Sequence, residues 1–161
     1  MASVRKANWL AFLLPAGLLG GALISQYGFG LYPCEMCMWQ RWPHLAAIIL
    51  ALPALMLGSK PLSRLLVIAA ALAILVSGLI GGFHAGVEYD WWEGLTSCAT
   101  SIPAGGDILD SIMNAPLVRC DVAPWSLFGI SLAGYNFLLS VGGAILILVM
   151  LATGRRKSDY V

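Results

Sequence analysis

The stretch Leu62–Phe83 reads LSRLLVIAAALAILVSGLIGGF and holds a single charged residue, Arg64, near its start. A helix of this length rises about 33 Å, which is enough to cross the roughly 30 Å hydrocarbon core of a bilayer. Such a helix satisfies its own backbone hydrogen bonds, as a lipid environment requires. The stretch therefore predicts a transmembrane helix, and it sets the class of the whole chain.

Three further apolar stretches, at about residues 9–27, 39–58 and 125–152, reach or approach the same length. The composition agrees, because 60% of the 161 residues are hydrophobic, only 11% are charged and the mean hydropathy is +0.85. Two basic residues precede the first stretch, but it is longer than the core of a signal peptide, about 7–15 residues, so we expect a retained helix. The sequence thus predicts an all-α membrane protein, a four-transmembrane-helix bundle forming one membrane domain, residues 1–161.

The basic residues predict the orientation of this bundle. Seven of the nine lie before the first span, between the second and third, or after the fourth: Arg5, Lys6, Lys60, Arg64, Arg155, Arg156 and Lys157. An even number of spans places these three regions on one side, which the positive-inside rule makes cytoplasmic, together with both termini. The loops at about 28–38 and 84–124 then face outward, and they contain all four cysteines. Disulfides are permitted there if that side is an oxidising periplasm.

Cys34 and Cys37 form a Cys-x-x-Cys pair at the start of the second predicted helix, directly after Pro33. A helix N-terminus lowers the pKa of a nearby thiol. The spacing permits a small disulfide ring, which constrains the unfolded chain little, so a redox role explains it better than a structural one. Zinc sites also use this motif, but Cys98 and Cys120 have 21 residues between them and provide no second Cys-x-x-Cys. We therefore expect a redox centre and no metal ligands.

Polar residues near the same membrane boundary are candidates for binding a ligand. Arg41 lies four residues after Cys37, on the same helical face, where it can stabilise a thiolate or polarise a bound carbonyl. An interfacial arginine that extends to lipid headgroups is the alternative. His44 could line the same pocket, although an interfacial role is favoured for it. His84, at the end of the third span, is expected at a similar depth as a hydrogen-bond donor to a ligand.

The second loop contains Cys98, Cys120 and a segment, 107–115, whose apolar and polar residues fall on opposite helical faces. This segment predicts a short amphipathic helix on the membrane surface. Four cysteines allow three pairings. Local spacing favours one disulfide within each loop, but a membrane protein that is merely stapled by disulfides would show the same pattern.

Several motifs together resemble the DsbB family of disulfide bond formation proteins. The segment Pro33–Arg41, PCEMCMWQR, matches the Pro-Cys-x-x-Cys-x-x-x-Arg motif of that family. Phe83–Glu88, FHAGVE, is similar to its His-x-Gly-x-Glu motif. Cys98 and Cys120 match the cysteine pair of its long loop, and Pro124–Ser131 is similar to its approach to the fourth helix. The resemblance covers nearly the whole chain and is more specific than Cys-x-x-Cys alone.

The resemblance implies a membrane thiol:quinone oxidoreductase in the bacterial inner membrane that supports disulfide bond formation. Its expected partners are the lipid bilayer, a periplasmic thioredoxin-fold oxidase of the DsbA type, which it would reoxidise, and the membrane quinone pool. The cofactor would be ubiquinone or menaquinone, with Cys37 facing it beside Arg41 and His84. We expect no nucleic-acid partner.

The resemblance also assigns roles to the other cysteines. Cys98 would form the mixed disulfide with the partner, Cys120 would be its mate in the loop, and Cys34 would exchange with that pair. The chain departs from the family at Glu35, where an acid lies inside the Cys-x-x-Cys motif. A carboxylate at this position is expected to raise a thiol pKa.

Three other classes of protein remain as alternatives. A quinone reductase of the vitamin K epoxide reductase type also combines four helices, a Cys-x-x-Cys motif and a loop cysteine pair. In that type the loop pair comes before the motif, whereas here Cys34 and Cys37 come first. The remaining alternatives are a non-enzymatic membrane protein with structural disulfides and a zinc-binding membrane protein.

Overall fold

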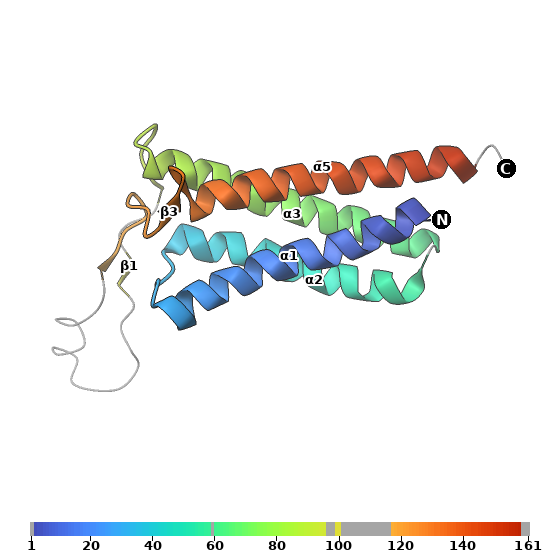
Figure 1. Ribbon diagram of the computed structural model, residues 1–161, viewed down its shortest axis with the longest axis horizontal. Coiled ribbons are helices and arrows are strands. Elements are labelled where there is room, and N and C mark those ends of the chain that lie inside the picture. The colour runs from blue at the N-terminus through green and yellow to red at the C-terminus, as the bar shows by residue number, and fades with distance from the viewer. Residues whose placement is uncertain (1, 59, 96–98, 101–116, 159–161) are drawn as a thin grey trace.

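The computed structural model describes residues 2–58, 60–95, 99–100 and 117–158. Four long helices run side by side along one axis (Figure 1). They are α1 (Ala2–Phe29), α2 (Glu35–Leu57), α3 (Pro61–Glu88) and α5 (Leu132–Ser158). Each contains a segment long and apolar enough to cross a membrane. The chain is therefore an all-α membrane protein built on a four-helix bundle, as predicted.

The two ends of the bundle carry different connections. Both termini and the turn between α2 and α3 lie at one end, and the other connections lie at the opposite end (Figure 1). Within the long second loop, β1 (Ala99–Thr100) pairs antiparallel with β2 (Leu117–Val118). Cys98 and the segment 107–115, where we expected an amphipathic helix, lie outside the described residues.

The start of the fourth helix differs from the expected position. We placed the fourth span from about residue 125, but α5 begins at Leu132. The preceding residues form a hairpin in which β3 (Ser126–Leu127) pairs antiparallel with β4 (Ile130–Ser131). Its two central residues, Phe128 and Gly129, have φ angles of 52° and 77°. Positive φ at both central positions is typical of the tight turns that join twisted strands, so this segment is a hairpin rather than a helix.

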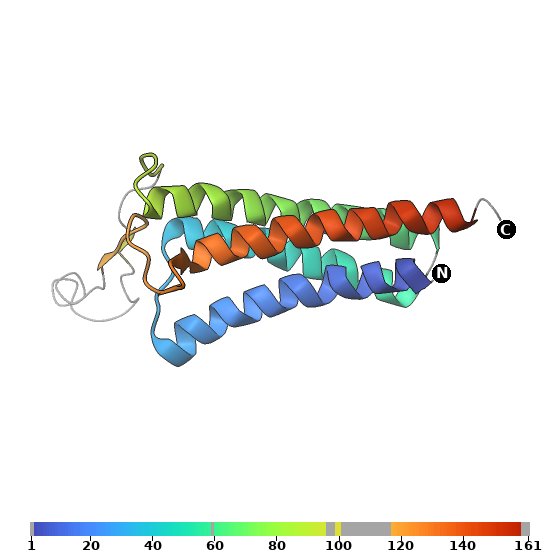
Figure 2. The same cartoon turned by 45° about the horizontal axis from the view of Figure 1, so that its top comes forward.

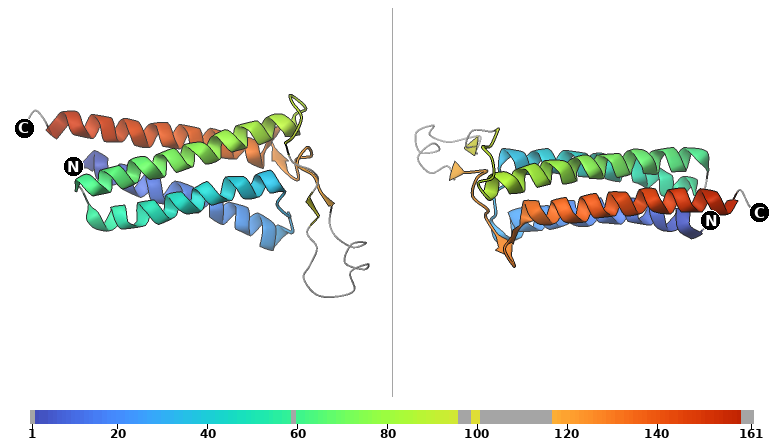
Figure 3. Two further views of the ribbon diagram at one scale, coloured as in Figure 1. Left: turned by 180° about the vertical axis from the view of Figure 1, so that it is seen from behind. Right: turned by 90° about the horizontal axis from the view of Figure 1, so that it is seen from above.

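Small side chains fill the core at the end with the termini. Helix α3 lies between α2 and α5, as Figure 3 (left) shows, and packs closely against both. The buried core is dominated by alanine: Ala7, Ala11, Ala47, Ala51, Ala54, Ala70, Ala71 and Ala144, with Val67, Ile74, Ile147 and Leu151. In lipid the association of helices depends on close van der Waals packing, which small residues permit. The alanines therefore explain the close approach of the helices here.

The glycines of the spans fall into two groups. Glycines in transmembrane helices commonly permit close helix packing, and this holds for Gly78 and Gly81, where an added Cβ would lie about 3.0 Å or less from side chains of α5. It does not hold for Gly17, Gly20 and Gly21 of α1, because a Cβ there would meet no atom within 4 Å. The α1 glycines therefore leave open space, and α1 leans away from α5 toward the end that bears the loops (Figure 2).

Candidate functional site: a buried dithiol beside an interhelical cavity

The Cys-x-x-Cys pair lies at the N-terminus of α2. Cys34 is the N-cap residue, and its sulfur accepts a hydrogen bond from the backbone N–H of Cys37 at 3.3 Å. The two Sγ atoms are 3.0 Å apart as a dithiol, with the thiol of Cys34 donating to the sulfur of Cys37. Cys34 is only 3% exposed. The local helix start thus holds both sulfurs in contact, with Cys34 buried and Cys37 half-buried.

The environment of Cys34 keeps this thiol protonated. Its hydrogen bond to Cys37, and secondly its burial, raise the pKa of Cys34 to about 12, while the hydrogen bond with His84 lowers it. The lowered pKa that a helix N-terminus would produce is therefore not found at Cys34 in the dithiol state. Glu35, which we expected to raise a thiol pKa, is exposed, and the main causes of the shift are instead Cys37 and burial.

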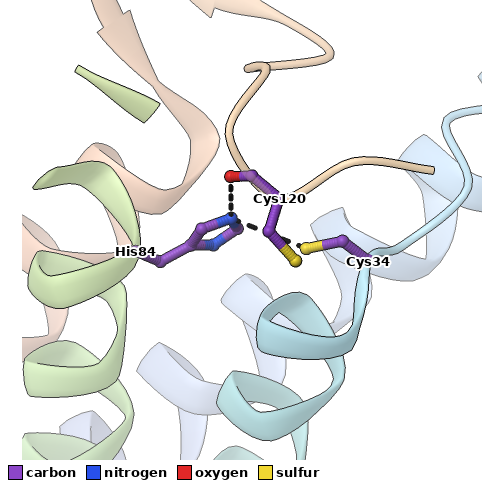
Figure 4. Close-up of side chains that lie close together, drawn as sticks. All are labelled: Cys34, His84 and Cys120. Atoms are coloured by element: carbon purple, nitrogen blue, oxygen red, sulfur yellow. Dashed lines mark hydrogen bonds between the residues drawn. The ribbon is translucent and has the colours of Figure 1, made fainter. Parts of the chain in front are cut away.

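Cys120 of the second loop reaches the same point. Figure 4 shows Cys34 at the start of α2, His84 on α3 and Cys120 on the loop gathered around one position. The Cys34 sulfur, the Cys120 sulfur and His84 Nε2 all lie within 4.8 Å of one another. His84 Nε2 is 3.2 Å from the Cys120 carbonyl oxygen, 3.5 Å from Cys34 Sγ and 3.8 Å from a Glu88 carboxylate oxygen. The loop therefore presents a cysteine directly to Cys34.

A cavity of about 260 Å³ lies beside the dithiol, between α1, α2 and α5. The residues that line it from α1 are apolar or small and include Gly17, Gly21 and Ala22. The polar residues that line it come mainly from α2 and α3: Cys37, Gln40, Arg41, His44, His84 and Glu88. The combination of an apolar wall with a few converging polar groups is typical of a small-molecule site.

The two cysteines of the motif face different spaces. Cys37 lines the interhelical cavity, whereas Cys34 is not among the residues that line it. Both cysteines line a second cavity of about 310 Å³, which is bounded by the second loop at Val118, Arg119 and Val122. Cys37 thus lies between the two cavities, and Cys34 faces the loop.

Arg41 lines the interhelical cavity with Cys37, but its contacts differ from those we expected. We expected the guanidinium to approach the sulfur of Cys37 four residues earlier. Instead it donates to Gln26 Oε1 at 2.6 Å and to the Ala22 carbonyl oxygen at 3.3 Å, both on α1. The charge of Arg41 is therefore held against α1. It fixes α1 against α2 and remains at the edge of the cavity.

Two polar residues of the site were missed at the sequence level. Gln40 of α2 and Asn136 of α5 are joined by a 2.8 Å hydrogen bond, and they link His84 to His44 across the bundle. Polar residues inside apolar spans are costly and commonly functional. Their recurrence at helical spacing could have revealed them, because Cys37, Gln40 and His44 share one face of α2.

The glycine in His-Ala-Gly-Val-Glu has a packing role. A Cβ at Gly86 would lie 2.0 Å from the indole of Trp92, so no other residue fits without displacing this ring. The ring stacks on Phe83 and donates to the Phe83 carbonyl oxygen at 2.9 Å. The start of the second loop is thereby folded back onto the end of α3, next to His84.

The fold and the site define a multi-pass membrane protein with a buried dithiol and a third cysteine delivered by a loop. The family model of the disulfide bond formation protein DsbB matches residues 4–150, so the chain belongs to this family. It is a disulfide bond formation protein of the bacterial membrane.

Curated relatives agree with this family. The chain is 34% identical over 146 residues to disulfide bond formation protein B of Chromohalobacter salexigens, covering 89% of this chain and 77% of the relative. It is 30% identical over 163 residues to the protein of the same name from Verminephrobacter eiseniae, covering 94% and 88%. An uncharacterised protein of Rickettsia prowazekii is 29% identical over 128 residues, covering 76% and 73%. No solved structure gives a significant match.

Proposed function

We propose that the protein is a thiol:quinone oxidoreductase that reoxidises a periplasmic thioredoxin-fold oxidase of the DsbA type. The observation that carries this proposal is the division between the two cysteines of the motif. Cys34 lies within 4.8 Å of the loop cysteine Cys120, while Cys37 lines the cavity between the helices. One sulfur is thus available to a protein disulfide and the other to a small electron acceptor.

The cysteines can pass electrons by ordinary thiol–disulfide exchange. The partner dithiol reduces the Cys98–Cys120 disulfide through a mixed disulfide with Cys98. The Cys120 thiolate then attacks the Cys34 sulfur of the Cys34–Cys37 disulfide and releases Cys37 as a thiolate. Cys98 in turn attacks the Cys120 sulfur, which restores the loop disulfide and releases Cys34. The net change moves two electrons and two protons from the partner to Cys34 and Cys37.

The interhelical cavity fits a quinone head group. Its volume of about 260 Å³ is just under the roughly 300 Å³ at which ligand pockets usually begin, so a ring fits while an isoprenoid tail extends into lipid. When bound, a quinone supplies the two-electron, two-proton acceptor for the dithiol. Arg41 at the cavity edge would orient a carbonyl, Cys37 would face the ring, and the apolar wall of α1 would exclude water.

The same proposal places the cysteine end of the bundle in the periplasm of a bacterial inner membrane. Arg5, Lys6, Lys60 and Arg64 all belong to the end with the termini, opposite the loops (Figure 1). The positive-inside rule assigns that end to the cytoplasm. A thiol oxidase facing the oxidising compartment requires this orientation.

A pair of adjacent glycines offers a test of the cavity. Gly21 lines it, whereas Gly20 does not, and a Cβ at either position would meet no atom within 4 Å. We expect Gly21→Leu to raise the apparent KM for a short-chain ubiquinone about tenfold, which corresponds to about 1.4 kcal/mol. The assay follows oxidation of a reduced DsbA-type protein by the purified enzyme.

Gly20→Leu is the matched control and is expected to retain the KM of the unmodified protein. Equal kinetics in the two variants would contradict a quinone site in this cavity. Failure of both Cys34→Ser and Cys37→Ser to reduce turnover would contradict the proposed activity as a whole.

A zinc site is a second candidate, because one observation favours it. We expected no metal, but Cys34, His84 and Cys120 present three potential ligand atoms within 4.8 Å of one another. Thiolate and imidazole are the ligands that zinc prefers. Metal analysis of the reduced protein separates the candidates, since stoichiometric zinc would favour a metal-binding role over thiol exchange.

A further inference from the structure

A chain of hydrogen bonds connects the four-helix core to the Cys34–Cys120 contact. It runs from Ser77 of α3 to Asn136 of α5, then to Gln40 of α2, and from there to His84 of α3. The last bonds lead from His84 to Cys120 and Cys34. An amide or a neutral imidazole can present either a donor or an acceptor to a given neighbour. The donor-to-acceptor direction of such a chain is therefore set by groups that can only donate or only accept.

Two backbone carbonyls give the chain a single direction. The Ser77 carbonyl can only accept, and it lies 3.2 Å from the Asn136 amide, which therefore presents its NH₂ group there. The same NH₂ group lies 2.8 Å from Gln40, so Gln40 presents its oxygen to Asn136. The Gln40 NH₂ group then faces the Met36 carbonyl at 3.1 Å, which is again an acceptor only. Reversing both amides would bring oxygen against oxygen at each carbonyl.

This direction determines the protonation pattern of His84. The Gln40 NH₂ group lies 2.9 Å from His84 Nδ1, so this nitrogen must be the acceptor and carries no hydrogen. In a neutral imidazole the hydrogen is then on Nε2. A hydrogen on Nδ1 would face the NH₂ group and leave a buried donor unsatisfied, which costs about 1–3 kcal/mol. His84 is 1% exposed, so water cannot replace the lost partner.

We propose that Gln40 and Asn136 are positioning residues that hold His84 as the Nε2–H tautomer, with this N–H directed at the Cys34 sulfur. His84 Nε2 lies 3.5 Å from Cys34 Sγ and 3.2 Å from the Cys120 carbonyl oxygen, so its single N–H is shared between these two acceptors. The backbone N–H of Cys37 is a second donor to the same sulfur. Two donors therefore meet Cys34 when it leaves as a thiolate, and stabilising a leaving thiolate accelerates thiol–disulfide exchange.

The tautomer also bears on the zinc alternative. A histidine that binds a metal through Nε2 needs a lone pair there and usually donates from Nδ1 to an acceptor. Here Nδ1 meets a donor, and Nε2 carries the hydrogen. The Cys34–His84–Cys120 cluster is thus organised to stabilise a thiolate and to disfavour a metal ion. The catalytic consequence rests on the proposed function, whereas the tautomer does not.

Space for this chain is provided by a glycine of α3. A Cβ at Gly81 would lie 2.9 Å from Asn136 Nδ2 and 3.1 Å from Gln40 Oε1, the two atoms of the central hydrogen bond. Gly81 therefore allows the bond between α2 and α5 to pass beside α3. This is a packing reason for a glycine at this position that helix contact alone does not give.

The test is the ¹⁵N and ¹³C NMR of isotopically labelled histidine in the reduced, bilayer-embedded protein. The chain has two histidines, so His44 serves as an internal reference. His44 Nε2 lies 2.9 Å from Asn136 Oδ1, an acceptor, so it too is expected to carry its hydrogen on Nε2. This reference depends on Asn136 but not on Gln40.

We expect both histidines to be Nε2–H tautomers in the unmodified protein. Gln40→Glu replaces the donor by an acceptor and should protonate Nδ1 of His84 while His44 keeps its signals. Gln40→Met should give a mixture of His84 tautomers. Ser140→Ala removes a 2.8 Å bond to Asn136 Oδ1 without altering the chain and should change neither tautomer.

The proposal is overturned if His84 carries its hydrogen on Nδ1 in the unmodified protein, or if both Gln40 variants leave its signals unchanged. Zinc titration of the reduced protein provides an independent readout, and stoichiometric binding would also overturn it. Neither measurement uses a quinone or a partner protein, so the result does not depend on the proposed oxidoreductase activity.

Discussion

The two ends of the bundle are filled in different ways. At the end with the termini, alanines and a few larger apolar side chains bring the four helices into close contact. The end with the loops instead contains a cavity between the helices, a second cavity bounded by the second loop, a dithiol and a chain of polar side chains. The end with the termini therefore serves as a closely packed frame that holds the helices together. The end with the loops leaves space for a ligand and for the reacting sulfurs.

Even the polar residues differ in role between the ends. Asn8 in the frame is 2% exposed and donates to the Ala54 and Gly58 carbonyl oxygens at 3.3 and 3.1 Å. These carbonyls belong to the end of α2, where an α-helix leaves acceptors unsatisfied. Asn8 therefore completes a helix terminus. Asn136, at the other end, instead links side chains that lead to the reacting sulfurs.

The largest expected effect is a loss of redox turnover without a loss of stability. Cys34→Ser and Cys37→Ser should each reduce turnover with a DsbA-type protein and ubiquinone at least a hundredfold, about 2.7 kcal/mol or more. Each variant removes one sulfur of the Cys34–Cys37 pair, which reduces the small acceptor in this account. The thermal unfolding temperature is the control, and it should change little. Retained turnover in either variant would count against the pair as the redox centre.

The dithiol also predicts a large effect of pH. With a pKa of about 12, Cys34 is almost entirely a thiol at pH 8, so thiolate-specific alkylation should be slow and should accelerate as the pH rises toward that value. Because the hydrogen bond to Cys37 is the largest cause of the raised pKa, Cys37→Ala should lower the pKa of Cys34. Alkylation at pH 8 should then increase at least about tenfold. Peptide-resolved mass spectrometry measures it, and an unchanged pH profile would contradict the assignment.

The frame predicts an effect on stability that the site does not share. Ala47 is buried and Ala46, next to it on α2, is exposed. Ala47→Leu overfills the core and should lower the free energy of unfolding by about 1–3 kcal/mol. Ala46→Leu points outward and should stay within about 0.5 kcal/mol. Denaturant unfolding in detergent compares them, and equal losses would show that the alanine core is not closely packed.

A smaller effect is expected where the hairpin joins the bundle. The Tyr89 hydroxyl donates to the Gly129 carbonyl oxygen at 2.9 Å and accepts from the Ser131 N–H at 3.0 Å. Tyr89→Phe removes both bonds and should cost about 1 kcal/mol of stability. Tyr27→Phe on α1, where the side chain is 80% exposed, is the control. Hydrogen exchange at Ser131 should increase only in the first variant; protection equal to that of the control would argue against this anchor.

The sequence was sufficient to predict the fold, because long apolar runs in lipid have few other solutions than helices. It failed locally at residues 126–131, where a tight turn at Phe128 and Gly129 interrupts an otherwise apolar run. The glycines of α1 and α3 show a similar limit. Gly17 and Gly78 look alike in the sequence, and only the packing of other helices around them differs.

The sequence predicts contacts in the candidate site only between residues that are close together along the chain. Cys34 and Cys37 are three residues apart, so their contact follows from the start of α2. We expected Cys120 and His84 near Cys34 because of the family resemblance and of the predicted depth of His84 in the membrane. Their spacing along the sequence does not indicate it. The partners of Arg41 and the bond between Gln40 and Asn136 join different helices. Such contacts depend on how the helices are rotated, which hydrophobicity alone does not specify.

The central claim is that Cys34 serves the loop and Cys37 serves the cavity. Disulfide mapping by mass spectrometry of Cys37→Ser and Cys34→Ser, prepared with the Cys98–Cys120 pair oxidised and kept without partner protein or quinone, tests it most directly. We predict that in Cys37→Ser the Cys34 thiolate attacks the Cys120 sulfur of the loop disulfide, releases Cys98 as a thiol and accumulates a Cys34–Cys120 disulfide, because these sulfurs are already close. Cys34→Ser should not accumulate a Cys37–Cys120 disulfide. A dominant Cys37–Cys120 disulfide, or equal trapping by both cysteines, would contradict the account.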